Sequence, residues 1–170
     1  MNSRKSASAS SAGTSLIEVM VSAAVVAIVA SIAVTGSLAA RRAAVVRAGA
    51  EQVAAFLRAT AGFTLNGVKA PGCDLADAAN VPRCSQYDVR LTQGSSTYDR
   101  SAVGGGTATL QTLPVGARFG DDHTVSFRYT PPTLTTTAAS IVIRHVSGSP
   151  VWRICVNTIG RVDLRRDACP

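Results

Sequence analysis

Four cysteines are the residues with the clearest chemistry in this chain. Cys73, Cys84, Cys155 and Cys169 include no C-x-x-C pair and have no histidine close by, a spacing that does not favour a zinc site. In a cytosolic protein they would be free thiols, whereas an even number in an exported domain favours disulfides, for which three pairings are possible. We predict the sequence-local pairing, Cys73 with Cys84 and Cys155 with Cys169.

Other residues that could do chemistry are few. The chain has no Walker lysine motif and no G-x-S-x-G. His123 follows Asp121 and Asp122 in an expected turn, and His145 lies in a strand pattern; adjacent turn acids could bind a cation but are more often solvated turn residues. Gly104–Gly106 leads into no helix, so it is not a phosphate loop. We therefore expect no metal, no cofactor and no enzymatic activity.

Glu18 is the single acid in a long apolar segment. Apart from it, the residues from Leu16 to Ala40 are apolar or small, and no charge occurs in the 22 residues from Val19 to Ala40. As a helix these 22 residues would be roughly 33 Å long, enough to cross a bilayer core of about 30 Å. A carboxylate just inside such a helix is costly and should find a cationic partner.

The first 13 residues are small and polar, and they include Arg4 and Lys5. An ordinary secretory signal is cut after its apolar run, which is then discarded. Here the basic segment precedes Gly13 and the apolar run follows, so cleavage after Gly13 would leave the helix on the mature protein. By the positive-inside rule the leader stays cytoplasmic and the C-terminal part is exported.

The helix is expected to continue beyond the apolar segment, over residues 41–67. Apolar side chains recur there at the spacing of one helical face: Val46, Ala50, Val53 and Leu57. Gly67 is a plausible C-terminal stop. Residues 14–40 would then form the membrane segment and residues 41–67 an amphipathic continuation.

Residues 68–170 predict one β-rich domain, because short alternating runs are separated by Gly, Pro, Ser and Asp. Two inward faces are expected to cover the amphipathic helix: Val125, Phe127 and Tyr129 on one strand, and Trp152, Ile154 and Val156 on another. The fold class is therefore α+β. The predicted strands are Tyr87–Leu91, Thr107–Leu113, Ala117–Phe119, Thr124–Tyr129, Ser140–His145, Val151–Val156 and Arg161–Leu164.

The segment Gly13-Thr-Ser-Leu-Ile-Glu-Val-Met-Val21 resembles the prepilin cleavage and methylation signature of type IV pilins and type II secretion pseudopilins. Gly13, Leu16, Ile17 and Glu18 match that pattern, while Thr14 stands where the family usually has Phe or Met. The resemblance implies cleavage after Gly13 by a prepilin peptidase and N-methylation of the new amine on Thr14. It also implies that Glu18 pairs with that amine on a neighbouring subunit during assembly.

A second resemblance covers most of the domain and points to the H-type pseudopilin and FimT/FimU minor pilin group. It rests on segments 113–119, 125–127, 141–143 and 153–162. It implies a pilin-like fold, with a long N-terminal helix docked on antiparallel sheet. The implied partners are other pilin or pseudopilin subunits, an assembly platform in the bacterial inner membrane, and membrane lipid. The domain would be extracytoplasmic, and the subunit would serve a type IV pilus or a type II secretion pseudopilus.

The alternative function is DNA binding in natural transformation. Some FimT-type members bind DNA through a C-terminal Gly-Arg-x-Arg, and the match here, Gly160-Arg161-Val162-Asp163, departs at the fourth position, although Arg165 and Arg166 follow. On a strand Asp163 would face the same way as Arg161 and Arg165 and would repel phosphates. The chain carries +7, and 15 basic and 10 acidic side chains remain after residue 13. A structural role is therefore favoured.

Overall fold

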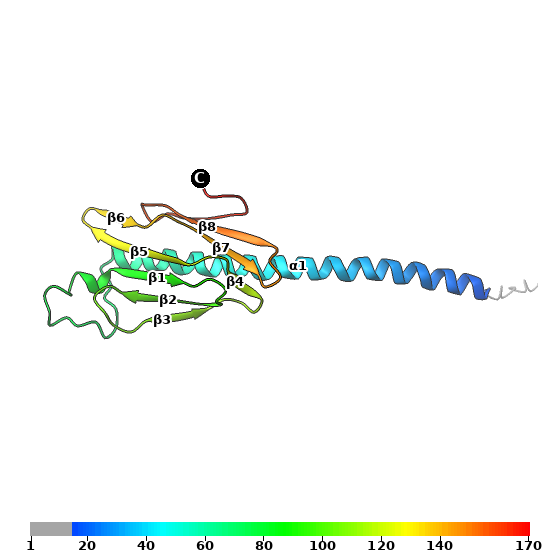
Figure 1. The fold of residues 1–170 in the computed structure, drawn as a ribbon, viewed down its shortest axis with the longest axis horizontal. Helices are drawn as coiled ribbons and strands as arrows, with labels where there is room; N and C mark the ends of the chain where they lie inside the picture. Colours follow the sequence, from blue (N-terminus) through cyan, green and yellow to red (C-terminus); the bar gives the residue numbers. More distant parts are fainter. Residues whose placement is uncertain (1–14) are drawn as a thin grey trace, which may run out of the picture. The chain divides into compact units, whose positions relative to one another are not determined.

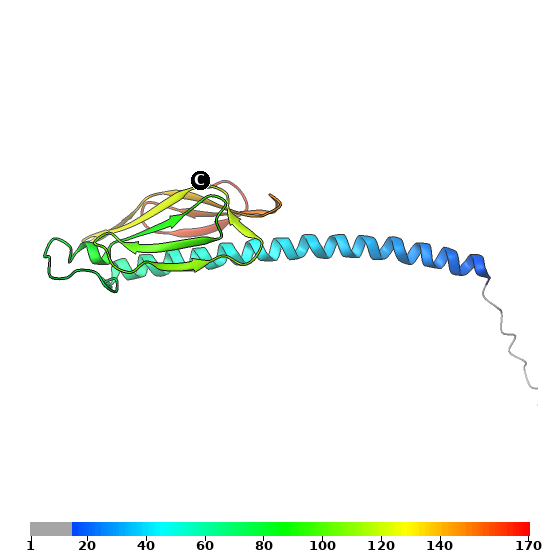
Figure 2. The same ribbon diagram turned by 60° about the horizontal axis from the view of Figure 1, so that its bottom comes forward.

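The computed structural model describes residues 15–170 and has an α+β layout, in which one long helix precedes antiparallel sheets. Helix α1 extends over Leu16–Leu65. The described residues divide into two units with the boundary between Ala39 and Ala40, and the second unit is Ala40–Pro170. The second unit holds the C-terminal part of α1 and every described strand, as the ribbon views show (Figures 1 and 2).

The strands of the second unit form two sheets. Sheet A has five strands in the order β3-β2-β1-β5-β6, and sheet B has four in the order β4-β7-β8-β9. Every neighbouring pair is antiparallel. The elements after α1 are η1 (Arg83–Ser85), β1 (Tyr87–Leu91), β2 (Thr97–Ala102), β3 (Thr109–Thr112), β4 (Ala117–Phe119), β5 (His123–Thr130), β6 (Thr133–Thr136), β7 (Ala139–His145), β8 (Val151–Val156) and β9 (Val162–Arg165).

Helix α1 ends in a Schellman arrangement built around Gly67. The Val68 N–H donates to the Phe63 carbonyl at 2.9 Å, and the Gly67 N–H donates to the Thr64 carbonyl at 3.2 Å. This pair of bonds requires a left-handed residue after the helix, and Gly67 has φ 63°. The predicted stop at Gly67 is therefore correct to within two residues of the last helical residue, Leu65.

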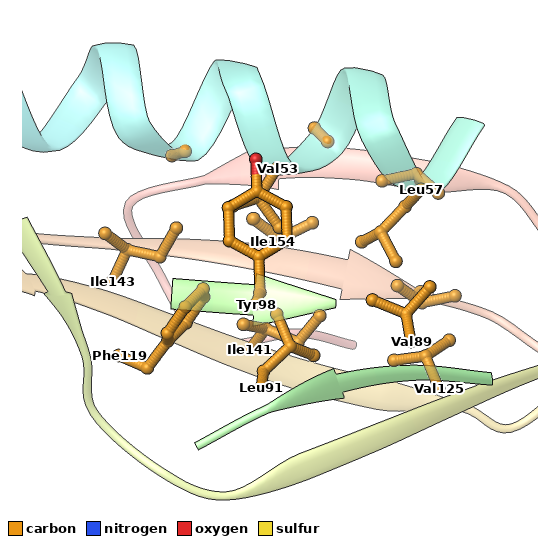
Figure 3. Packing of buried hydrophobic residues seen from close by; sticks show 14 of the residues in the cluster. Val53, Leu57, Val89, Leu91, Tyr98, Phe119, Val125, Ile141, Ile143 and Ile154 are labelled. Atoms are coloured by element: carbon orange, nitrogen blue, oxygen red, sulfur yellow. The ribbon is translucent and has the colours of Figure 1, made fainter. Parts of the chain in front are cut away.

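The amphipathic face of α1 lies in the core between the two sheets. Val46, Ala50, Val53 and Leu57 are fully buried, as their helical spacing predicts. Figure 3 shows Val53 and Leu57 pointing from the helix towards side chains of both sheets, including Val89 and Ile154. The predicted inward strand faces are also found: Val125, Phe127, Ile154 and Val156 are buried, while Tyr129 and Trp152 are half-buried.

Polar side chains of the same helix cover one edge strand of each sheet. The Gln52 amide donates to the Thr112 carbonyl of β3 at 2.9 Å, and the Arg58 guanidinium donates to the Val162 carbonyl of β9 at 2.8 Å. Both strands lie at sheet edges, where unpaired backbone groups would otherwise invite pairing with other chains. The helix therefore closes the sandwich by hydrogen bonding as well as by burial.

The predicted strands all occur, three of them, β1, β4 and β8, with the predicted bounds. Strands β2 and β6 were not predicted. Strand β6, Thr-Leu-Thr-Thr, directly follows Pro131–Pro132, a pair that predicts a turn. Strand β2 lacks the apolar alternation because Arg100 takes an inward position between the buried Tyr98 and Ala102.

Arg100 can take that inward position because aromatic rings surround its guanidinium. The carbon at the centre of the group lies 4.5 Å from the ring centre of Phe63, 5.2 Å from that of Phe56 and 5.3 Å from that of Tyr87. Cation–π attraction offsets part of the cost of desolvating the charge. Burial lowers the pKa of Arg100 from its usual value, and the nearby Tyr87 partly opposes this shift.

Candidate functional site

Glu18 lies in the first turn of α1, where the helix dipole favours a negative charge. The Ser15 carbonyl accepts hydrogen bonds from the N–H groups of Glu18 at 2.9 Å and Val19 at 3.2 Å, so Ser15 is at the N-cap and Glu18 at the third helical position. Within residues 15–170 no basic side chain is within ion-pair distance of the Glu18 carboxylate. Gly13 and Thr14, the predicted cleavage junction, lie outside the described residues.

The residues on both sides of Glu18 form an exposed apolar helical surface. Leu16 is 80% exposed, and Ile17, Met20 and Ile32 are all at least 65% exposed. Helix α1 is long and apolar enough to span a membrane, and none of its most apolar 18-residue stretch is buried in the protein. Apolar side chains in such number and so exposed need lipid or another protein around them.

The structure contains two disulfides, Cys73–Cys84 and Cys155–Cys169. These are the sequence-local pairs. They fix the loop after α1 to η1, and the C-terminal segment to β8. Disulfides of this kind are compatible with an extracytoplasmic domain.

Removing the second disulfide should destabilise the domain. Its cysteines are 14 residues apart, and opening a loop of that size restores unfolded-state entropy worth about 3 kcal/mol. The double variant Cys155→Ala/Cys169→Ala should therefore lose about that much free energy of unfolding, measured in urea by the fluorescence of the single tryptophan, Trp152. An unchanged unfolding midpoint would contradict this expectation.

The Gly160–Arg161 segment forms the turn between β8 and β9. The Asn157 carboxamide oxygen accepts from the N–H groups of Ile159 and Arg161, and Gly160 has φ 80°, as in three-residue hairpin loops with a left-handed glycine. A side chain at position 160 would also meet Leu134 at 2.6 Å. Turn geometry therefore explains this glycine without a ligand.

The three C-terminal arginines do not converge on one point. Arg161 pairs with Asp163 at 3.0 Å, Arg165 lies opposite Arg153 on β8, and the Arg166 guanidinium lies 5.2 Å from the Trp152 ring centre. A hollow of about 410 Å³ is lined by Arg161, Asp163 and Arg165 beside the Cys155–Cys169 disulfide. Asp163, which we expect to repel phosphates, lies directly beside Arg161 in this ion pair.

Arg161→Ala should change the affinity for duplex DNA less than about twofold, because the arginine is already paired with Asp163. If Arg161, Arg165 and Arg166 all contacted phosphates, the salt slope would be about −2.7 and this variant would reduce it by about 0.9. Fluorescence anisotropy of the detergent-solubilised chain at two salt concentrations separates the two cases. Tight binding that is lost in Arg161→Ala and strengthened by Asp163→Arg would favour DNA uptake instead.

The Asp121–Asp122 turn is hydrogen-bonded to the segment that follows β1. The Asp122 carboxylate accepts a hydrogen bond from the Gln93 N–H at 2.6 Å. Among the described residues, no group of three or more His, Cys, Asp or Glu side chains could hold a metal ion. The hydrogen bond to Gln93 therefore gives Asp122 a structural role.

Sequence reasoning missed three arginines, Arg118, Arg144 and Arg153, which share the outer face of sheet B with Arg165. Their strands were predicted, but the antiparallel register that places these arginines together could not be read from the chain.

Comparison with family models, with curated protein sequences and with solved structures found no match to this chain.

Proposed function

We propose that the chain is a pilin-like structural subunit, a minor pilin or pseudopilin of a type IV pilus or a type II secretion pseudopilus. The observation that carries the proposal is Glu18 in the first turn of an exposed apolar helix. The disulfide-bonded α+β domain supports it, because a filament subunit needs a stable exported domain. The helix would lie in the inner membrane before assembly and in the filament core afterwards.

Glu18 has a specific part in this proposal. Its carboxylate is costly in an apolar environment unless a cation is nearby. Cleavage after Gly13 would create an amine on Thr14, four residues before Glu18. When helices of neighbouring subunits pack with an axial offset of about 6 Å, which is four residues of helix, the amine of one subunit would pair with the carboxylate of the next.

The proposal is tested by the N-terminus of the mature protein. Mass spectrometry of membrane-extracted chain should find Thr14 as the first residue, with a methylated amine. A Gly13→Asp variant, which disrupts the residue before the cut, should remain unprocessed with its leader attached. An intact N-terminus in the native chain, or cleavage beyond Ala40, would contradict the pilin-like role.

A further inference from the structure

The outer face of sheet B carries an arginine on each of its four strands. Side chains alternate between the two faces of a strand, and the buried positions of each strand identify its inward face. Ala117 and Phe119 flank Arg118, and both are buried. The same alternation, with Ile141, Ile143 and Ile154 inward, puts Arg144, Arg153 and Arg165 outward.

The register sets these arginines opposite one another in two pairs. Arg118 is the cross-strand partner of Arg144, and Arg153 is the cross-strand partner of Arg165. Like charges directly opposite each other destabilise a sheet. The two arginine pairs therefore lower the stability of sheet B, and a bound anion would remove this repulsion.

The outer face of sheet A is different because its charges balance. Asp88 pairs with Arg128 at 2.7 Å and also accepts from Ser126, and Arg90 lies opposite Asp99 in the register of β1 and β2. The outer face of sheet B carries the acidic residue Asp163, but Asp163 is already paired with Arg161. The excess positive charge of the domain therefore gathers on one sheet.

The arginine pairs have room and spare hydrogen-bonding capacity, although Arg118 already donates one long hydrogen bond, to the Gly94 carbonyl at 3.4 Å. Within residues 15–170, none of the four arginines has a carboxylate within ion-pair distance. The Nε of Arg153 is buried and has no hydrogen-bond partner there. Arg118 and Arg144 line a hollow of about 400 Å³, and Arg165 lines the hollow beside the second disulfide.

We propose that the outer face of sheet B binds a carboxylate-rich surface of a partner protein, with one carboxylate group at each arginine pair. Guanidinium groups bind carboxylates with two parallel hydrogen bonds. From strand spacing and rise the two pairs are about 12 Å apart, which is close to two turns of a helix, about 11 Å. The proposal goes beyond the filament role and does not depend on it.

A protein partner fits this face better than a nucleic acid. The outward positions beside the arginines are Val142, Val151 and Cys155, so the strands offer no aromatic platform on which bases could stack. Acidic residues also come soon after the two edge strands of the sheet: Asp121 follows β4, and Asp167 follows β9. They would repel a polyanion that extends beyond the arginines, but not a compact acidic patch.

The test is binding of a labelled acidic helix to the full-length chain in non-ionic detergent at about 0.15 M salt. The probe is a fluorescein-labelled peptide of about 20 residues with Glu along one face, and its Gln counterpart is the control. We expect the Glu peptide to bind and Arg144→Gln/Arg165→Gln to raise its Kd at least about tenfold. The matched variant Arg83→Gln/Arg90→Gln, which removes the same charge away from this face, should change the Kd less than about twofold.

The thermal unfolding midpoint of Arg144→Gln/Arg165→Gln should be equal to or higher than that of the unmodified chain, since one arginine of each opposed pair is gone. A lower midpoint would contradict the argument from like-charge pairs. Absent binding, or equal losses in both double variants, would overturn the proposal. A single-stranded oligonucleotide of equal charge that binds more tightly through the same arginines would assign the face to nucleic acid.

Discussion

Glu18→Ala should reduce incorporation of the chain into filaments at least about tenfold while leaving its membrane insertion intact. Losing a pairing worth about 1.4 kcal/mol is enough for a tenfold change, and an ion pair in an apolar setting usually contributes more when one partner is removed. Insertion should not suffer, because removing a carboxylate lowers the cost of placing the helix in lipid. The measurement is the ratio of chain in the sheared filament fraction to chain in the membrane fraction.

The matched control is Glu51→Ala, the same substitution on the same helix. Glu51 pairs with Arg47 at 2.7 Å on an exposed surface, an interaction worth about 0.3–0.5 kcal/mol. This control should assemble almost normally. Normal assembly of Glu18→Ala would mean that the charge is incidental and serves only the helix dipole.

The helix and most strands could be predicted because burial follows local periodicity. Val46, Ala50, Val53 and Leu57 recur at helical spacing and are buried together, and β8 alternates with period two. Gly67 marks the end of the helix because the left-handed position after a helix favours glycine. These patterns lie within one element, so one stretch of sequence carries them.

Contacts between elements could not be predicted from such patterns. Strand β2 escaped prediction because the aromatic rings that accommodate Arg100 come from α1 and β1, Phe63 and Tyr87 among them. The arginine face of sheet B depends on the register of four strands, and the first two of them, β4 and β7, are separated in the chain by β5 and β6, which belong to the other sheet. Arg118 and Arg144 are 26 positions apart in the chain, and only pairing of β4 with β7 makes them neighbours.

Leu57→Ala should lower the free energy of unfolding of the domain by about 2–5 kcal/mol. Leu57 is fully buried where α1 meets the sheets (Figure 3), and a leucine truncated in such a place loses burial and leaves a cavity. The total free energy of unfolding of a domain of this size is only about 5–15 kcal/mol, so the loss would be a large fraction of its stability.

The control for this prediction is Leu65→Ala, the same substitution at the last residue of the same helix, where the side chain is 48% exposed. Surface substitutions of this kind usually change stability by about 0.5 kcal/mol or less. Urea unfolding followed by Trp152 fluorescence measures both variants, since Trp152 is the single tryptophan of the chain and packs against the same core. Equal losses in the two variants would mean that the amphipathic part of α1 does not hold the sheets together, because burial at position 57 would then contribute no more than a half-exposed leucine at the end of the helix.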